Sequence, residues 1–174
     1  AGHQPLTSRS GRFVLTFNGE IYNHLELRKE LEADRRINWA GHCDSETLVE
    51  AISAWGLRPA LERCVGMFAL AAWDRETRQL SLARDRFGEK PLYFGYAGKD
   101  FAFASELRPL ADHPSFDRRI DRTALAKLAA RGYIPAPHSI FEGIRKLEPA
   151  SILTIDADDV AQRRTPRTIP YWSY

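Results

Sequence analysis

The chain has 174 residues with 44% hydrophobic content, enough for one domain around a single core. Its 25 Lys and Arg residues nearly balance 23 Asp and Glu residues, and no basic run or basic helix face is present, which excludes nucleic acid as an expected partner. The apolar segments fall far short of the roughly 20 residues that cross a bilayer, and no signal-peptide pattern opens the chain, so membrane insertion is excluded and a cytoplasmic protein is expected.

The first predicted element is a strand over residues 12–17, where apolar and polar side chains alternate. Asn18 and Gly19 follow it directly, and this dipeptide is a common hairpin signal because both residues tolerate positive φ. The same pair also suits a functional role, since the glycine lets the backbone approach a ligand, and its N–H and the Asn amide can donate to an oxyanion. Taken alone, the dipeptide favours the plain turn.

Two helices are expected next. Asn23 fits an N-cap and Glu26 completes a capping box, which predicts a short amphipathic helix over residues 24–33. A second helix begins near Ser45 and ends at Gly56. Its apolar stripe consists of Leu48, Val49, Ile52 and Trp55.

Four strand-like runs follow in two pairs. Residues 67–73 and 79–84 are separated by a short polar stretch and are expected to form one antiparallel hairpin. Residues 92–97 and 101–104 are expected to form another.

The connection between the two hairpins, residues 84–93, combines a cluster of charges with a glycine and a proline. This composition favours a structural turn. Asp85 is expected to pair there with Arg84 or Arg86 as a buried ion pair.

The remaining elements are a helix over residues 122–130 with Asp121 as its cap, and a strand over residues 151–155. The inward face of this helix is expected to consist of Leu125, Leu128 and Ala129. Residues 163–174 have the composition of a linker. Strands joined by hairpins, with helices grouped between them, favour antiparallel sheets covered by helices.

Two carboxylates complete the candidate site. Asp44 lies just before the second helix, where its plain role is an N-cap worth about 1 kcal/mol, but it also suits a substrate ammonium. The same alternative holds for Glu20, which otherwise is a solvated turn residue. Cys43 has no nearby base and Cys64 lies among apolar residues, so neither is expected to be a nucleophile. The spacing of the five histidines predicts no metal site.

A wider resemblance is carried by motifs that recur in one order along the chain. They are Gly2-His3-Gln4-Pro5, Phe17 to Asn23, Asp44-Ser45-Glu46, Gly66-Met67-Phe68-Ala69, Ala83 to Gly88, Lys90-Pro91-Leu92-Tyr93, Ala104-Ser105-Glu106, Gly132-Tyr133-Ile134-Pro135 and Phe141-Glu142-Gly143-Ile144. In this combination the chain resembles the glutaminase (class II glutamine amidotransferase) domain of glutamine-hydrolysing asparagine synthetases.

The resemblance implies an α+β fold, the four-layer αββα sandwich of the N-terminal-nucleophile hydrolases, truncated here at the N-terminus. In such enzymes an N-terminal Cys thiolate attacks the glutamine amide, with its own α-amino group as base. Carried over to this sequence, Asn18 and Gly19 form the oxyanion hole, and Glu20 and Asp44 bind glutamine with them. The ammonia then serves a synthetase domain that activates aspartate with ATP and Mg.

The chain begins at Ala1, which has no nucleophilic side chain. We therefore expect residues 1–162 to be a partial amidotransferase domain, inactive alone, and residues 163–174 a linker toward a synthetase domain. No cofactor is expected in this chain, since ATP and Mg belong to that domain. The expected partners are glutamine and the synthetase domain of the same polypeptide, with a homodimer as a further option. The alternatives are a non-catalytic glutamine-binding or assembly module and an amidotransferase for another acceptor.

Overall fold

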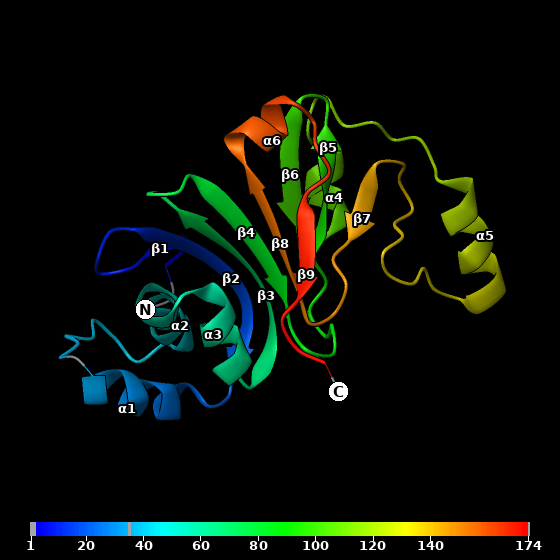
Figure 1. Cartoon of the computed structure of the whole chain (residues 1–174). Coiled ribbons are helices and arrows are strands. Elements are labelled where there is room, and N and C mark those ends of the chain that lie inside the picture. The colour runs from blue at the N-terminus through cyan, green and yellow to red at the C-terminus, as the bar shows by residue number, and fades with distance from the viewer. Residues whose placement is uncertain (1–2, 35, 174) are drawn as a thin grey trace.

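The computed structural model describes residues 3–34 and 36–173, whose strands form two antiparallel sheets (Figure 1). The larger sheet has the order β1-β2-β3-β4-β8-β9 and the smaller one β6-β5-β7. The larger sheet consists of β1 (Leu6–Thr7), β2 (Phe13–Ile21), β3 (Gly66–Asp74), β4 (Gln79–Arg84), β8 (Ser151–Asp156) and β9 (Arg167–Pro170). The smaller sheet consists of β5 (Tyr93–Ala97), β6 (Asp100–Ala104) and β7 (Ile144–Lys146).

Helices lie mainly on one side of the larger sheet, which α1, α2 and α3 cover in Figure 1, while α4 lies against β6. The helices are α1 (His24–Asp34), α2 (Asp44–Trp55), α3 (Leu57–Arg63), α4 (Leu107–Ala111), α5 (Arg122–Arg131) and α6 (Ala157–Ala161). None of the helices in the described ranges is long and apolar enough to cross a membrane.

Two hydrophobic cores hold these layers together. In β2, the alternate residues Leu15, Phe17 and Ile21 are buried against the first three helices. On the other side of the sheet, Leu82 and Leu153 pack toward the smaller sheet in a second core. Each fully buried side chain of this size contributes roughly 1.5–3 kcal/mol relative to exposure. The layered helices and antiparallel sheets confirm the predicted α+β class.

The two predicted hairpins are confirmed, since β3 pairs with β4 and β5 with β6 in antiparallel register. The helix with the apolar stripe is confirmed as α2, which Gly56 ends. The strand predicted over residues 151–155 is confirmed as β8.

The hairpin turn that the Asn18-Gly19 dipeptide favours when taken alone is not formed, because both residues lie inside β2, opposite Ala69 and Phe68 of β3. A Cβ atom at Gly19 would lie 2.1 Å from the Met67 carbonyl oxygen. The glycine therefore allows two backbones to approach closely, and the chain continues straight through the dipeptide instead of reversing.

Asn23 precedes α1 as expected, but the predicted capping box is not formed. The Asn23 side-chain oxygen accepts a hydrogen bond from the Val65 N–H at 2.9 Å, and Nδ2 donates to the Arg63 carbonyl at 3.0 Å. Asn23 thus ties the start of α1 to the connection between α3 and β3. The fold brings this connection next to Asn23, although it lies about 40 residues further along the chain.

The ion pair expected in residues 84–93 is also wrong. The Asp85 carboxylate is fully buried and accepts hydrogen bonds from four backbone N–H groups at 2.9–3.2 Å. These groups belong to Phe68, Phe87, Glu89 and Lys90. The Arg84 guanidinium instead donates to the carbonyl oxygens of Gly88, Lys90 and Leu147. Each charge is therefore satisfied by the backbone of the folded loop.

Asp121 caps α5 as predicted, since its Oδ1 accepts from the N–H groups of Thr123 and Ala124. The predicted inward face is wrong, however, because Leu125 is 47% exposed and Leu128 is 37% exposed. Helix α5 stands apart from both sheets in Figure 1. Helical spacing showed which side chains share a face, and no other element covers this one within the described residues.

The segment expected to be a linker, residues 163–174, contains β9, which pairs with β8 and extends the larger sheet. Tyr171 follows it and is only 3% exposed, with its hydroxyl donating to the Arg84 carbonyl at 3.1 Å. At least residues 167–171 therefore pack as part of the domain.

Candidate functional site

The candidate site residues lie along one edge of β2. Strand β1 pairs with β2 only at Val14 and Leu15, so the later part of this edge has no strand beside it within the described residues. The Gln4 side chain bonds the backbone of Phe17 as a neighbouring strand would. Its Oε1 accepts from the Phe17 N–H at 2.6 Å, and its Nε2 donates to the Phe17 carbonyl at 2.7 Å. We call residues 17–21 of this strand the free edge of β2.

Asp44 closes the other end of the free edge. Its Oδ2 accepts a hydrogen bond from the Ile21 N–H at 2.9 Å, and its Oδ1 accepts from the Ser45 N–H at 2.8 Å. The N-cap position of α2 is held by Cys43, so Asp44 is the first helical residue instead of the cap. Its carboxylate joins the start of α2 to the strand that carries Asn18 and Gly19.

Gly19 lies midway along the free edge. Backbone N–H groups alternate between the two edges of a strand, so the N–H of Gly19 points to the same edge as those of Phe17 and Ile21. Those two neighbours donate to Gln4 and Asp44, respectively. The Gly19 N–H is therefore directed outward between two polar side chains.

Asn18 projects into a cavity of about 220 Å³ between the larger sheet and β6. Its Nδ2 donates to Ser105 Oγ at 3.0 Å, which fixes the orientation of the amide. The cavity is lined by Gln4, Thr16, Phe17, Asn18, Ala69, Leu70, Ala71, Leu92, Phe103, Ala104 and Ser105. Asp44 does not line it, so the structure connects Asn18 and Asp44 through β2 and not by direct contact.

Glu20 is exposed near the C-terminal end of β2, on the face of the strand that also carries Asn18. The pKa of the neighbouring Tyr22 phenol is raised, first by partial desolvation and then by the negative charges of Glu89, Glu20 and Asp85. Glu20 is therefore close enough to Tyr22 to disfavour ionisation of its phenol.

The two cysteines lie away from this cavity. Burial raises the pKa of the Cys64 thiol to about 12, so it stays protonated and packs in the core as expected. Cys43 is half-buried and lines a different cavity, beside Glu46 and Glu50. Across residues 3–34 and 36–173, no three or more His, Cys, Asp and Glu side chains gather in a group that can hold a metal ion.

Sequence reasoning assigned no role to Gln4 or Ser105. Both stand within the motifs that carry the family resemblance, which was the available signal. Their contacts join residues 13 and 87 positions apart in the chain, so neither spacing nor periodicity identifies them.

A protein-family model described as a glutamine amidotransferase domain matches residues 1–172. The chain belongs to this glutamine amidotransferase family. A Mycobacterium tuberculosis relative, provisionally named a glutamine-hydrolyzing asparagine synthetase, is 40% identical over 175 residues, covering 97% of this chain and 27% of the relative. Asparagine synthetase (glutamine-hydrolyzing) 3 of Bacillus subtilis is 36% identical over 160 residues, covering 90% of this chain and 26% of that protein. The predicted resemblance is thereby confirmed, and the chain spans about a quarter of the length of these relatives.

Solved structures support the same fold. Glutamine phosphoribosylpyrophosphate amidotransferase from B. subtilis superposes with a TM-score of 0.65 at 20% identity, covering 98% of this chain and 32% of that one. A glutamine aminotransferase class-II domain protein from Silicibacter pomeroyi superposes with a TM-score of 0.56 at 17% identity, covering 97% of this chain and 72% of that one. The likeness confirms the predicted α+β fold of two antiparallel sheets with helices.

Proposed function

We propose that this chain forms the glutamine-binding wall of a glutaminase site, which supplies ammonia for the ATP-dependent amidation of aspartate. The observation that carries the proposal is the free edge of β2, where the Gly19 N–H points outward between Gln4 and Asp44, next to the Asn18 amide. The names of the curated relatives favour asparagine synthesis as the use of the ammonia.

Asn18 and Gly19 are proposed to stabilise the oxyanion that forms when the glutamine amide is attacked. An Asn amide carries two N–H donors, and Ser105 engages one of them, which leaves the second for a ligand. The Gly19 N–H supplies the other donor. Removing one such donor typically costs about 3 kcal/mol of transition-state stabilisation, close to a hundredfold in rate.

Asp44 is proposed to hold the α-ammonium of the substrate, and Glu20 is proposed to help seat the glutamine. Each Asp44 oxygen accepts one backbone N–H, and a carboxylate oxygen has a second lone pair that remains available. The two N–H bonds hold this carboxylate at the free edge, so its charge is oriented before a ligand arrives.

The attacking group is proposed to come from outside these 174 residues. The cavity around Asn18 offers the hydroxyl groups of Thr16 and Ser105, but the described residues that line it carry neither a thiol nor a titratable side chain. We therefore infer that the chain by itself does not hydrolyse glutamine. A synthetase domain in the cytoplasm is the proposed user of the ammonia, and ATP and Mg²⁺ are assigned to that domain.

The test compares two nitrogen sources in the complete protein. Asp44→Asn is expected to raise the KM for glutamine at least about tenfold, because the ammonium loses a charged partner, while synthesis from free ammonia is unchanged. Asn18→Ala is expected to lower kcat with glutamine about a hundredfold, while synthesis from free ammonia is again unchanged. Asp112→Asn, at an exposed position that does not line the cavity around Asn18, is the matched control. Equal loss with glutamine and ammonia in the Asp44 variant would contradict the assignment.

A further inference from the structure

A second polar cavity lies between the start of α5 and strand β7. Its volume is about 290 Å³, close to the lower end of small-molecule sites. It is lined by Asp121, Pro137, His138, Ser139, Gly143, Ile144 and Arg145. None of these residues lines the cavity that contains Asn18, so the two sites are separate.

The hydroxyl of Ser139 is the first indication of a ligand. Ser139 is only 2% exposed, and its Oγ has no hydrogen-bond partner among the described residues. A buried hydroxyl without a partner is unfavourable, and nearly all such groups in folded proteins are satisfied. A group that enters the cavity and bonds this oxygen would remove the penalty.

The two charges that line the cavity are the second indication. The Asp121 Oδ1 accepts from the first turn of α5, which fixes the carboxylate in place. Arg145 is exposed on β7. Although both line one small cavity, no ion pair joins Asp121 to Arg145 within the described residues. A carboxylate and a guanidinium that line one cavity without forming an ion pair complement a ligand that carries both charges.

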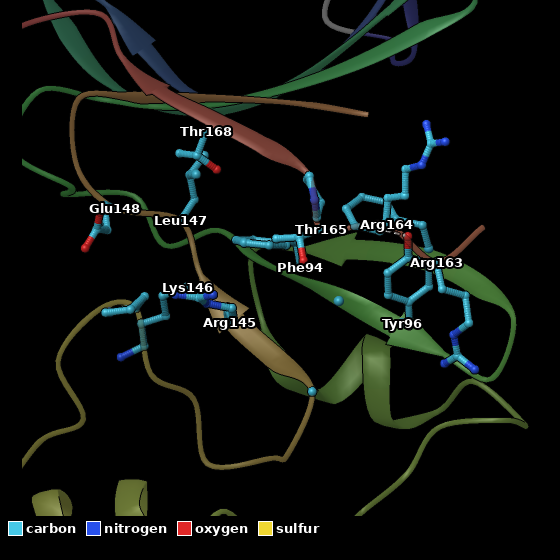
Figure 2. A pocket seen from close by; sticks show the side chains of 15 residues that line it. Phe94, Tyr96, Arg145, Lys146, Leu147, Glu148, Arg163, Arg164, Thr165 and Thr168 are labelled. Atoms are coloured by element: carbon cyan, nitrogen blue, oxygen red, sulfur yellow. Dashed lines mark hydrogen bonds between the residues drawn. The ribbon is translucent and has the colours of Figure 1, made fainter. Parts of the chain in front are cut away.

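A larger cavity adjoins the polar one. It measures about 460 Å³ and shares Pro137, Gly143 and Arg145 with it. Figure 2 shows Phe94 and Tyr96 of β5 facing this space below the segment that carries Arg163 to Thr165. An apolar side chain attached to a charged ligand in the polar cavity therefore has an aromatic surface beside it.

Most cations of the larger cavity already have partners, and one of these partners, Tyr96, lines the cavity itself. Lys146 donates to the Ile134 carbonyl, Arg164 pairs with Asp159 at 3.3 Å, and the Arg163 guanidinium lies 5.4 Å from the centre of the Tyr96 ring. Arg145 has no comparable contact within the described residues, which makes it the cation best placed for a ligand carboxylate.

We propose that the polar cavity binds a free α-amino acid with an aromatic side chain. Arg145 and the Ser139 hydroxyl contact its carboxylate, Asp121 contacts its ammonium, and its side chain extends toward Phe94 and Tyr96. Charged hydrogen bonds orient the zwitterionic head, and the aromatic surface stabilises the side chain.

The test uses two-dimensional amide NMR of the 19.8 kDa chain, titrated with L-phenylalanine to about 10 mM, which saturates a millimolar site. Shifts are expected at residues 121–124 and 138–145 and not at residues 18–21. The matched analogues are 3-phenylpropionate, which lacks the ammonium, and 2-phenylethylamine, which lacks the carboxylate. Each is expected to bind at least about tenfold more weakly, because one charged hydrogen-bond partner is left unpaired.

Three variants test the assigned contacts. Ser139→Ala and Arg145→Gln are expected to weaken binding of L-phenylalanine at least about threefold and tenfold, respectively. Asp121→Asn keeps a good helix cap while removing the charge, so it tests the ammonium contact without loss of α5. Arg131→Gln, which removes a charge at the far end of α5, is the matched control and is expected to bind normally. Absence of shifts, shifts confined to residues 18–21, or equal binding of the three compounds would overturn the proposal.

Discussion

Asp85→Asn is expected to destabilise the domain by about 3 kcal/mol or more. In the native protein, Oδ1 accepts from two backbone N–H groups and Oδ2 from two others. An Asn side chain has a single acceptor oxygen, so in either rotamer its NH₂ group faces two N–H donors. Each buried N–H that loses its acceptor costs about 1–3 kcal/mol, and the closeness of four donors adds repulsion.

The position of Asp85 links this loss of stability to the site. Its backbone N–H donates to the Phe68 carbonyl at 2.8 Å, and Phe68 lies opposite Gly19 in the β2–β3 ladder. A disturbed loop at Asp85 therefore reaches the strand behind the proposed oxyanion donor. Domains are typically stable by only about 5–15 kcal/mol, so a loss of this size is readily measured.

The assay is equilibrium unfolding in urea, followed by the fluorescence of the four tryptophans. Asp112→Asn, an exposed carboxylate with the same change in charge, is the control and is expected to stay within about 0.5 kcal/mol of the parent. If Asp85→Asn unfolds at the parent's urea concentration with an unchanged slope, the backbone N–H groups do not depend on this carboxylate and the reasoning fails.

Three further predictions concern other residues. The pKa of Asp74 is lowered from 3.8 to about 2, chiefly by its hydrogen bond from Arg12, so its contribution is fully present above pH 3.8 and is lost as the pH falls through about 2. Asp74→Asn should therefore cost about 1–2 kcal/mol near neutrality, after allowance for solvent screening, and much less at about pH 2.5; a cost independent of pH would refute the linkage. Iodoacetamide at about pH 8 should modify Cys43 in the folded chain and reach Cys64 only on unfolding, which mass spectrometry of the labelled peptides checks. Gly19→Ala places a methyl group 2.1 Å from a carbonyl oxygen of β3 and should lower the free energy of unfolding by about 2 kcal/mol or more. An unchanged thermal midpoint would show that β2 and β3 can move apart to accommodate the methyl group without loss of stability.

Elements with a strong local pattern were predictable from the sequence. The apolar stripe that ends at Trp55 predicted α2, and the polar interval after Trp73 predicted the β3–β4 hairpin. Both predictions were possible because side-chain periodicity is fixed by the backbone geometry of the element itself. Asp121 was also identified correctly as a cap, since a cap bonds to N–H groups two and three residues away.

Features that depend on a distant partner were not predictable. The Asn18-Gly19 dipeptide by itself favours a turn, and only its pairing with β3 places it inside a strand. The same holds for Asn23, whose amide bonds to residues about 40 positions away instead of capping its own helix. Leu125 and Leu128 show the opposite failure. Helical spacing predicted that they share a buried face, but nothing in the described structure covers them.

The sequence by itself determined the family, the antiparallel class of the fold and the residue types of the candidate site, since ordered motifs and short-range periodicity are properties of the chain. Tertiary structure alone decided that Gln4 and Asp44 bracket Gly19, that Ser105 orients Asn18, and that Ser139 lies buried without a partner. The physical reason is that a hydrogen bond depends on separation in space, and residues far apart along the chain meet only once the sheets have formed.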